Sequence, residues 1–257
     1  MLSGVVIEAG MVAALRSLSV MGKIDVDWGA ILIGFGCLNI LVGNLMALRQ
    51  NQVKRLLAYS SLAHVGYMLL GFGFALAFGQ LNGATGGFFH LITHSLMKGL
   101  AFLAAGALMF AMYISRQQHA ALTLDDLNGA SRKYPVVAFV FSAALLALGG
   151  LPPLAGFMSK WQILVAGVEA KNVLMTIVVI FAALNSILSL GYYAPLVNRM
   201  YRREPSEAVQ NGNKVSAMMV VPLVILAVAI VVIGVWPPSV EFLTTKASLS
   251  MLYTFFN

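Results

Sequence analysis

Apolar stretches of about twenty residues recur along nearly the whole sequence, and they constrain the fold more than any single motif. A helix that crosses a bilayer needs roughly 20 mostly apolar residues. Six stretches have about that length: 2–20, 29–48, 54–79, 85–114, 173–199 and 215–236. The chain is 60% hydrophobic and only 10% charged, with a mean hydropathy of +0.88. Strands of alternating polarity are absent, so we predict an all-α polytopic membrane protein forming a single transmembrane domain over residues 1–257.

The region 135–168 permits two interpretations. An apolar run at 135–149 and a second run at 157–168 flank the sequence GLPPLAG at 150–156. Each run is too short to cross a bilayer in the usual way. Gly150, Pro152 and Pro153 are expected to break a helix between them. The region therefore forms either two short crossings or one crossing made of two half-helices.

The distribution of basic residues favours the single, discontinuous crossing. With that topology, the loops 49–55, 115–134 and 199–214 all lie on one side of the membrane. They carry 10 of the 16 basic residues: Arg49, Lys54, Arg55, Arg116, Arg132, Lys133, Arg199, Arg202, Arg203 and Lys214. The opposite side receives only Arg16, Lys23, Lys171 and Lys246. By the positive-inside rule we predict about seven crossings with the basic loops cytoplasmic. The net charge of +7 is therefore explained by basic residues that collect in the loops on one side of the membrane, and no nucleic-acid partner is expected.

Few titratable residues remain inside the predicted spans. His90, His94 and Lys98 follow one another at intervals of four residues and so share one stripe of a helix. Lys160 follows the predicted helix break, and His64 and Glu8 lie in two other spans. A lysine at the centre of a spanning helix costs about 2.5–3.5 kcal/mol, so such residues usually face a polar interior and mark an ion path.

Each of these residues also has a structural interpretation. The two histidines could pack helices together, Lys98 could form an ion pair with Glu8, and Lys160 could simply end a kink. A metal site at HLITH is disfavoured because it lacks the glutamate of HExxH and has no evident third ligand. Lys54 could equally be a solvated loop charge. Histidine titrates near neutrality, and burial disfavours the charged form of lysine, so we interpret the set as a proton relay.

Three motifs resemble one known family. QNQVKRLLAYSSLAHVGYMLLG (50–71), FFHLITHSLMKGLAFLAAG (88–106) and GGLPPLAGFMSKWQIL (149–164) are similar to the antiporter-like subunits of respiratory complex I. Mrp antiporter subunits and membrane-bound hydrogenase subunits belong to the same family. The histidine–lysine helix is similar to the chain L and Mrp type, whereas residues 124–157 are more similar to chain N.

This resemblance implies a transporter fold of two inverted five-helix repeats, each containing a broken helix. Residues 1–20 would be the last helix of the first repeat, 29–199 the second repeat, and 215–257 a final helix and tail. The family's key residues would correspond to Lys54, His90, His94, Lys98 and Lys160. Glu8 departs from the pattern, because relatives often carry lysine there, so a carboxylate would take the place of that lysine. The rest of the first repeat would lie upstream of Met1, and we expect such sequence to exist.

The resemblance implies a proton-translocating membrane subunit of an NADH:quinone oxidoreductase-like complex. The chain would bind no cofactor, with NAD and quinone used elsewhere in the complex. Its partners would be other membrane subunits, protons and the lipid bilayer, in the bacterial inner membrane. The alternatives are a subunit of an Mrp-type Na⁺/H⁺ antiporter or membrane-bound hydrogenase, and an anchor that conducts nothing.

Overall fold

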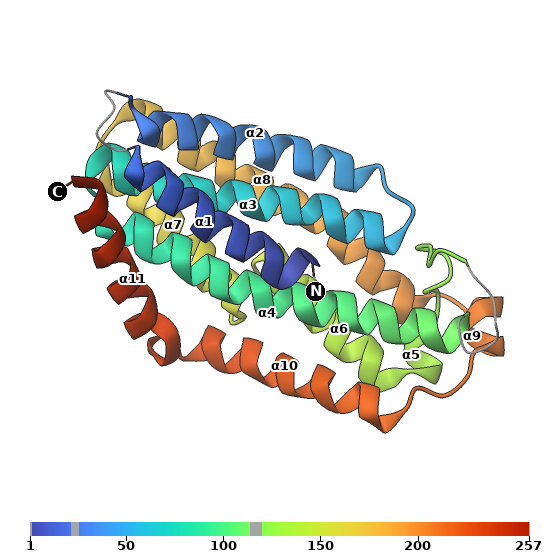
Figure 1. The fold of residues 1–257 in the computed structure, drawn as a ribbon. Helices are drawn as coiled ribbons and strands as arrows, with labels where there is room; N and C mark the ends of the chain where they lie inside the picture. Colours follow the sequence, from blue (N-terminus) through green and yellow to red (C-terminus); the bar gives the residue numbers. More distant parts are fainter. Residues whose placement is uncertain (1, 22–25, 114–119, 257) are drawn as a thin grey trace.

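A computed structural model describes residues 2–21, 26–113 and 120–256, which form a bundle of long helices (Figure 1). In chain order the helices are a π-helical turn η1 (Leu2–Val6), α1 (Ile7–Val20), α2 (Trp28–Leu48), α3 (Val53–Phe78), α4 (Leu81–Met112), α5 (Ala130–Lys133), α6 (Pro135–Gly149), α7 (Ala155–Glu169), α8 (Val173–Arg202), α9 (Glu207–Asn211), α10 (Ala217–Val235) and α11 (Pro238–Phe256). Over the described ranges the only β pairing is an isolated bridge between Gln52 and Thr123. The all-α prediction is confirmed.

Among the described residues, five helices are long and apolar enough to cross a membrane: α2, α3, α4, α8 and α10. The helix α1 has 14 residues, and α6 and α7 have 15 each, so the prediction of seven crossings goes beyond these five. The predicted spans agree with the helices to within a few residues. Two differences stand out: α4 begins at Leu81, four residues earlier than expected, and the expected tail forms the helix α11, which packs against α4.

The helix break was predicted correctly. Gly150 ends α6 with a left-handed backbone (φ +83°), and Pro152 and Pro153 lie exposed in the connection before α7. Along α8, Gly149 contacts Leu190, Lys160 contacts Ser186, and Gly167 contacts Val179. The half-helices α6 and α7 therefore contact successive stretches of α8. A single interrupted crossing would place the two half-helices in this way.

The loops predicted to share one side lie together at one end of the bundle (Figure 1). The Val53 amide donates to the Leu122 carbonyl (3.0 Å), and the Gly129 amide donates to the Arg199 carbonyl (3.0 Å). The Ser206 amide donates to the Asn128 carbonyl (3.1 Å). These bonds join the loop before α3, the segment before α5 and the segment after α8. Arg116 and Lys23, which contributed to the charge argument, lie outside the described residues.

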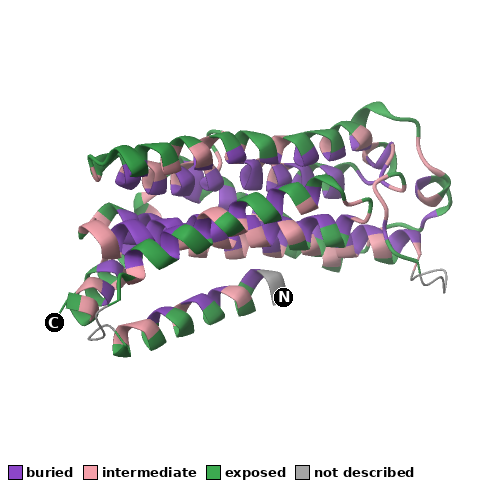
Figure 2. Cartoon of the chain, turned by 90° about the horizontal axis from the view of Figure 1, so that it is seen from above, coloured by how far each residue is buried: buried purple, intermediate pink, exposed green. Residues whose placement is uncertain are grey.

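Burial is graded across the bundle (Figure 2). Most of α3 and α4 is buried, whereas most of α8 and α10 is not. The exposed side chains on the outer helices are themselves apolar, as Phe35, Ile180 and Val231 illustrate. An apolar exterior around a core that contains buried polar groups is expected of a protein whose outer surface meets lipid.

Candidate functional site: a buried cluster of histidines and lysines

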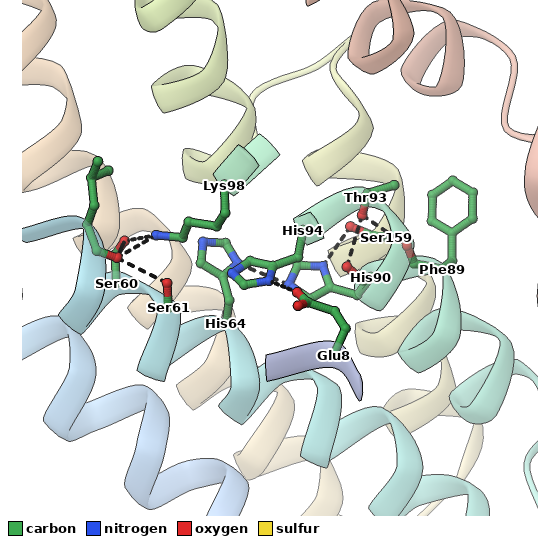
Figure 3. Close-up of polar contacts among 11 residues, drawn as sticks. Glu8, Ser60, Ser61, His64, Phe89, His90, Thr93, His94, Lys98 and Ser159 are labelled. Atoms are coloured by element: carbon green, nitrogen blue, oxygen red, sulfur yellow. Dashed lines mark hydrogen bonds and ion pairs between the residues drawn. The ribbon is translucent and has the colours of Figure 1, made fainter. Parts of the chain in front are cut away.

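The helices α3 and α4 bring three histidine rings together in the core (Figure 3). His64 comes from α3, and His90 and His94 come from α4; all three side chains are buried. The His64 ring centroid lies 5.1 Å from that of His90 and 4.9 Å from that of His94. Nδ1 of His64 and Nε2 of His90 are 3.0 Å apart, so one ring donates a hydrogen bond to the other. The predicted stripe on α4 therefore gains a third imidazole from the neighbouring helix.

The second ring nitrogen of His90 connects this row to the broken helix. His90 Nδ1 lies 2.8 Å from the Ser159 hydroxyl oxygen, and Ser159 is fully buried on α7. Ser159 is followed directly by Lys160 in the sequence. The histidine row thus reaches α7 one residue before its buried lysine.

Glu8 enters the cluster from the first turn of α1. Its Oε1 lies 2.5 Å from His94 Nδ1, and both side chains are buried. The ion pair between Glu8 and Lys98, considered above as a structural alternative, is therefore replaced by a pair between Glu8 and His94. Glu8 Oε2 and His94 Nε2 have no hydrogen-bond partner among the described residues. Each of these two atoms can therefore take part in one further hydrogen bond.

Lys98 is completely buried one turn further along α4. Its Nζ donates to the Leu57 carbonyl (2.8 Å) and to the Ser60 hydroxyl of α3. Within the described part of the chain, no carboxylate lies within ion-pair distance of this ammonium. Its hydrogen bonds therefore go to neutral oxygen atoms.

Lys160 is held at the helix break, as its position after the prolines predicted. Its Nζ donates to the Leu148 carbonyl (3.0 Å) and to the Ser186 hydroxyl (3.0 Å), and it lies 5.0 Å from the centroid of the Tyr67 ring. The last carbonyls of a helix lack intrahelical partners, so the end of α6 presents acceptors at this point. A Cβ on Gly150 would lie 3.2 Å from Lys160 Cδ, so the glycine supplies both the backbone conformation and the space.

Lys54 and the prolines lie apart from the cluster. The Lys54 side chain is exposed at the start of α3, and Pro152 and Pro153 are exposed at the break. For Lys54, the geometry favours the solvated-charge interpretation. The prolines act on the site only through the interruption of the helix.

Sequence reasoning missed the hydroxyl groups that join the cluster, namely Ser60, Ser159, Ser186 and Tyr67. Ser60, His64 and Tyr67 recur at helical spacing on one stripe of α3, which is a signal that could have identified two of them. Among the described residues there is no group of three or more His, Cys, Asp or Glu side chains arranged to hold a metal ion. The described contacts form a row of groups that can each donate or accept a proton.

A comparison with known proteins identifies the family. The family described as "NADH:quinone oxidoreductase/Mrp antiporter, TM" matches residues 1–186, which is more than half of the chain. The chain belongs to this family. It is an integral membrane protein of the antiporter-like type, as the sequence motifs predicted.

Two curated relatives are named as subunit N of a dehydrogenase or an oxidoreductase. The F(420)H(2) dehydrogenase subunit N of Methanosarcina mazei is 32% identical over 250 residues, covering 95% of this chain and 49% of the relative. The NADH-quinone oxidoreductase subunit N 2 of Sorangium cellulosum is 34% identical over 223 residues, covering 84% of this chain and 41% of the relative. This chain spans about half the length of the curated relatives that it matches.

Solved structures show the same fold. A chain of respiratory complex I from Thermus thermophilus is 32% identical, with a TM-score of 0.66 over 82% of this chain and 44% of that one. A chain of the Mrp complex from Dietzia sp. DQ12-45-1b is 22% identical, with a TM-score of 0.83 over 99% of this chain and 54% of that one. The second likeness concerns the fold alone.

Proposed function

We propose that this chain is a proton-translocating membrane subunit of an NADH:quinone oxidoreductase-like complex. The observation that carries the proposal is the buried row between two lysines, in which Lys98 and Lys160 flank the rings of His64, His90 and His94. Buried titratable groups in a membrane domain are costly and usually mark an ion pathway. The relatives named above, which are N subunits of an F(420)H(2) dehydrogenase and of an NADH-quinone oxidoreductase, support the same assignment.

Protons would enter from the end that carries the basic loops, which we place in the cytoplasm. They would pass Lys98 and the histidines and leave past Lys160. Neutral imidazole carries one donor and one acceptor, so each ring can accept a proton on one nitrogen and release one from the other. The direct contacts from His64 to His90 and from His90 to Ser159 provide two such steps.

The energy for proton translocation would come from changes of charge elsewhere in the complex. A charge that arrives near a buried lysine changes the free energy of its protonated form, because interactions are strong in a low-dielectric interior. NAD and quinone would react on other subunits, and the complex would lie in a bacterial inner membrane. Residues 1–20 would end a first five-helix repeat, and 29–199 would form the second, inverted repeat.

A cation/proton antiporter of the Mrp type is the alternative function. The name of the matching family, which includes the Mrp antiporter beside NADH:quinone oxidoreductase, favours it. Sodium prefers several oxygen ligands, yet Glu8 is the only carboxylate within the predicted spans and is paired with His94. We therefore rank redox-driven proton translocation first.

Replacement of Lys160 tests the proposal. Arginine retains the positive charge but does not release its proton in a protein. If Lys160 exchanges protons, Lys160→Arg should impair pumping about as severely as Lys160→Ala. The measurement is proton uptake per quinone reduced in vesicles that contain the intact complex.

The matched control is Lys171→Arg, which makes the same replacement at an exposed lysine before α8. It should pump like the unchanged complex, and native gels should show that all variants assemble. Normal pumping by an assembled Lys160→Arg complex would refute a relay role for this lysine.

A further inference from the structure

A small polar cavity lies at the end of the bundle opposite the basic loops, where the first turns of α4, the second half of α7 and the first turn of α11 meet (Figure 1). Its volume is about 160 Å³. Pockets that enclose drug-sized ligands measure about 300–1,000 Å³, so this cavity admits only a small chemical group. The side chains that line it are Asn82, Thr85, Trp161, Gln162, Val165 and Glu241.

Several hydrogen-bond acceptors border this cavity, and one of them has no partner. Gln162 Oε1 is buried and accepts no hydrogen bond from any described residue. Buried polar atoms nearly always have a partner, so this oxygen indicates a donor that enters the cavity. The Glu241 carboxylate forms no ion pair within the described part of the chain. Asn82 donates through Nδ2 to Glu169 (2.8 Å), which leaves its Oδ1 available to another donor.

The charge and chemistry of the lining select a cation. The lining residues include no lysine, arginine or histidine, so the Glu241 carboxylate supplies the only charge among them. The indole ring of Trp161 also attracts cations, because the face of an aromatic ring is negative. A primary ammonium has three N–H donors and no acceptor, which suits the oxygen atoms of Glu241, Gln162 and Thr85. A metal ion is disfavoured, because the described residues include no group of three or more His, Cys, Asp or Glu arranged to hold one.

The surroundings of the cavity indicate that the ammonium belongs to a lipid. Trp161 is 54% exposed, and its ring stacks with that of Phe157 on α7, with centroids 6.1 Å apart. Phe242 and Leu243 directly follow Glu241 on α11, and each is at least half exposed. Tryptophan is enriched where the hydrocarbon of a bilayer meets the headgroups. An acyl chain can therefore lie along these apolar side chains while the headgroup reaches the cavity.

We propose that this cavity binds the primary ammonium headgroup of a membrane phospholipid on the side of the membrane opposite the basic loops. Glu241 neutralises the ammonium, Gln162 and Thr85 accept its hydrogen bonds, and Trp161 provides a cation–π contact. Because these contacts come from three helices, the bound headgroup links α11 to α4 and α7. A trimethylated ammonium has no N–H donor, so the site distinguishes between the two kinds of headgroup.

A photolabelling experiment on the intact complex tests the site. The complex is reconstituted in phosphatidylglycerol vesicles that contain a trace of phosphatidylethanolamine with a photoreactive diazirine on its acyl chain. After illumination, peptide mass spectrometry should locate the label on α7 and α11, beside Phe157 and Phe242. Unlabelled phosphatidylethanolamine should compete with the label, whereas phosphatidylcholine, whose nitrogen carries three methyl groups, should not.

Glu241→Gln keeps the size of the side chain and removes its charge. It should reduce the labelling of α7 and α11 by about tenfold, which is roughly what the loss of a hydrogen bond to a charged group causes. Glu207→Gln is the matched control, because it makes the same change at an exposed carboxylate at the other end of the bundle, and it should leave the labelling unchanged. Gln162→Met removes the unpartnered acceptor at similar size. It is the second variant, and it replaces Glu241→Gln if the latter fails to assemble on native gels.

Each other outcome overturns the proposal. If phosphatidylcholine competes as well as phosphatidylethanolamine, or if both variants are labelled like the unchanged complex, the lipid contacts only the apolar surface and the cavity holds no headgroup. If calcium chloride removes the label and unlabelled phosphatidylethanolamine does not, the cavity is a metal site. An absence of label on α7 and α11 would show that another subunit covers this face. The labelling does not depend on pumping, so its result is independent of the proposed function.

Discussion

At the residue scale, the candidate site is made of ionisable side chains that are buried in the core. Glu8 and the two lysines lie in the core, yet within the described residues the only buried ion pair joins Glu8 to His94. Moving a charge out of water costs several kcal/mol even after relaxation, and hydrophobic replacements often stabilise a protein. The cluster is therefore poorly explained as a stabilising device, whereas proton transfer requires such groups.

Glu8 supports a prediction about stability. Glu8→Ala leaves His94 Nδ1 without its 2.5 Å partner, and an unsatisfied buried group costs about 1–3 kcal/mol. Glu8→Gln retains an acceptor oxygen and should cost less. We expect the midpoint of thermal inactivation of the detergent-solubilised complex to fall in the order unchanged, Gln, Ala. Equal midpoints for the Gln and Ala variants would show that the hydrogen bond contributes nothing.

The sequence predicted which charged residues are buried but not which groups receive their hydrogen bonds. His90, His94, Lys98 and Lys160 could be identified because ionic side chains are conspicuous in an apolar stretch. Serine and tyrosine are common in such stretches and mark no site by themselves. The pairing of Glu8 with His94 depends on the angle at which α1 crosses α4, and local sequence does not determine this angle.

At the scale of the elements, α2 and α3 show how the scaffold is packed. Gly29, Gly36 and Gly43 recur every seven residues on α2 and face Ala77, Gly66 and Ala63 of α3. Small residues allow helix backbones to approach closely, and the resulting van der Waals packing contributes to helix association in a bilayer. This contact fixes α3, and α3 carries Ser60, His64 and Tyr67 into the site.

The glycine contact predicts unequal effects of two alanine substitutions on one helix. A Cβ on Gly36 would lie 2.9 Å from the Gly66 carbonyl oxygen and 3.0 Å from Leu70, whereas nothing lies within 4 Å of a Cβ on Gly34. Gly36→Ala should destabilise the chain by about 1–3 kcal/mol through overpacking. Gly34→Ala should be neutral or stabilising, since alanine favours helix. Chain abundance and thermal stability in membranes measure the difference, and equal effects would contradict the close contact.

The helices themselves were largely predictable, with two instructive exceptions. The interruption between α6 and α7 follows from local chemistry, because proline and glycine impose it whatever surrounds them. The early start of α4 and the helix α11 depend on tertiary packing. Gly83 and Gly86 at the start of α4 fit closely against α3 and α7, and the polar residues Glu241 and Lys246 lower the hydropathy of α11.

At the scale of the whole molecule, the two ends of the bundle differ in the charge of their loops, and hydrogen bonds or ion pairs join the segments that lie at each end. The basic loops meet at one end, where Arg132 pairs with Glu204 and Arg199 pairs with Asp125. The α3–α4 connection and the α7–α8 connection lie at the other end. There, Asn82 at the start of α4 donates a hydrogen bond to Glu169 at the end of α7 (2.8 Å). A polarised molecule of this kind should insert in one orientation, with most of its arginine and lysine residues in the cytoplasm.

This orientation gives the last prediction. Reporter fusions after Arg55, near Ala121 and near Asn211 should all report the cytoplasm, because backbone hydrogen bonds join these segments at one end of the bundle. Fusions after Gly79 and after Lys171 should report the opposite side. The Asn211 and Lys171 fusions are decisive, because two full crossings in place of α6 and α7 would exchange their sides. If Asn211 reported the side opposite to Arg55 and Ala121, α6 and α7 could not form one interrupted crossing.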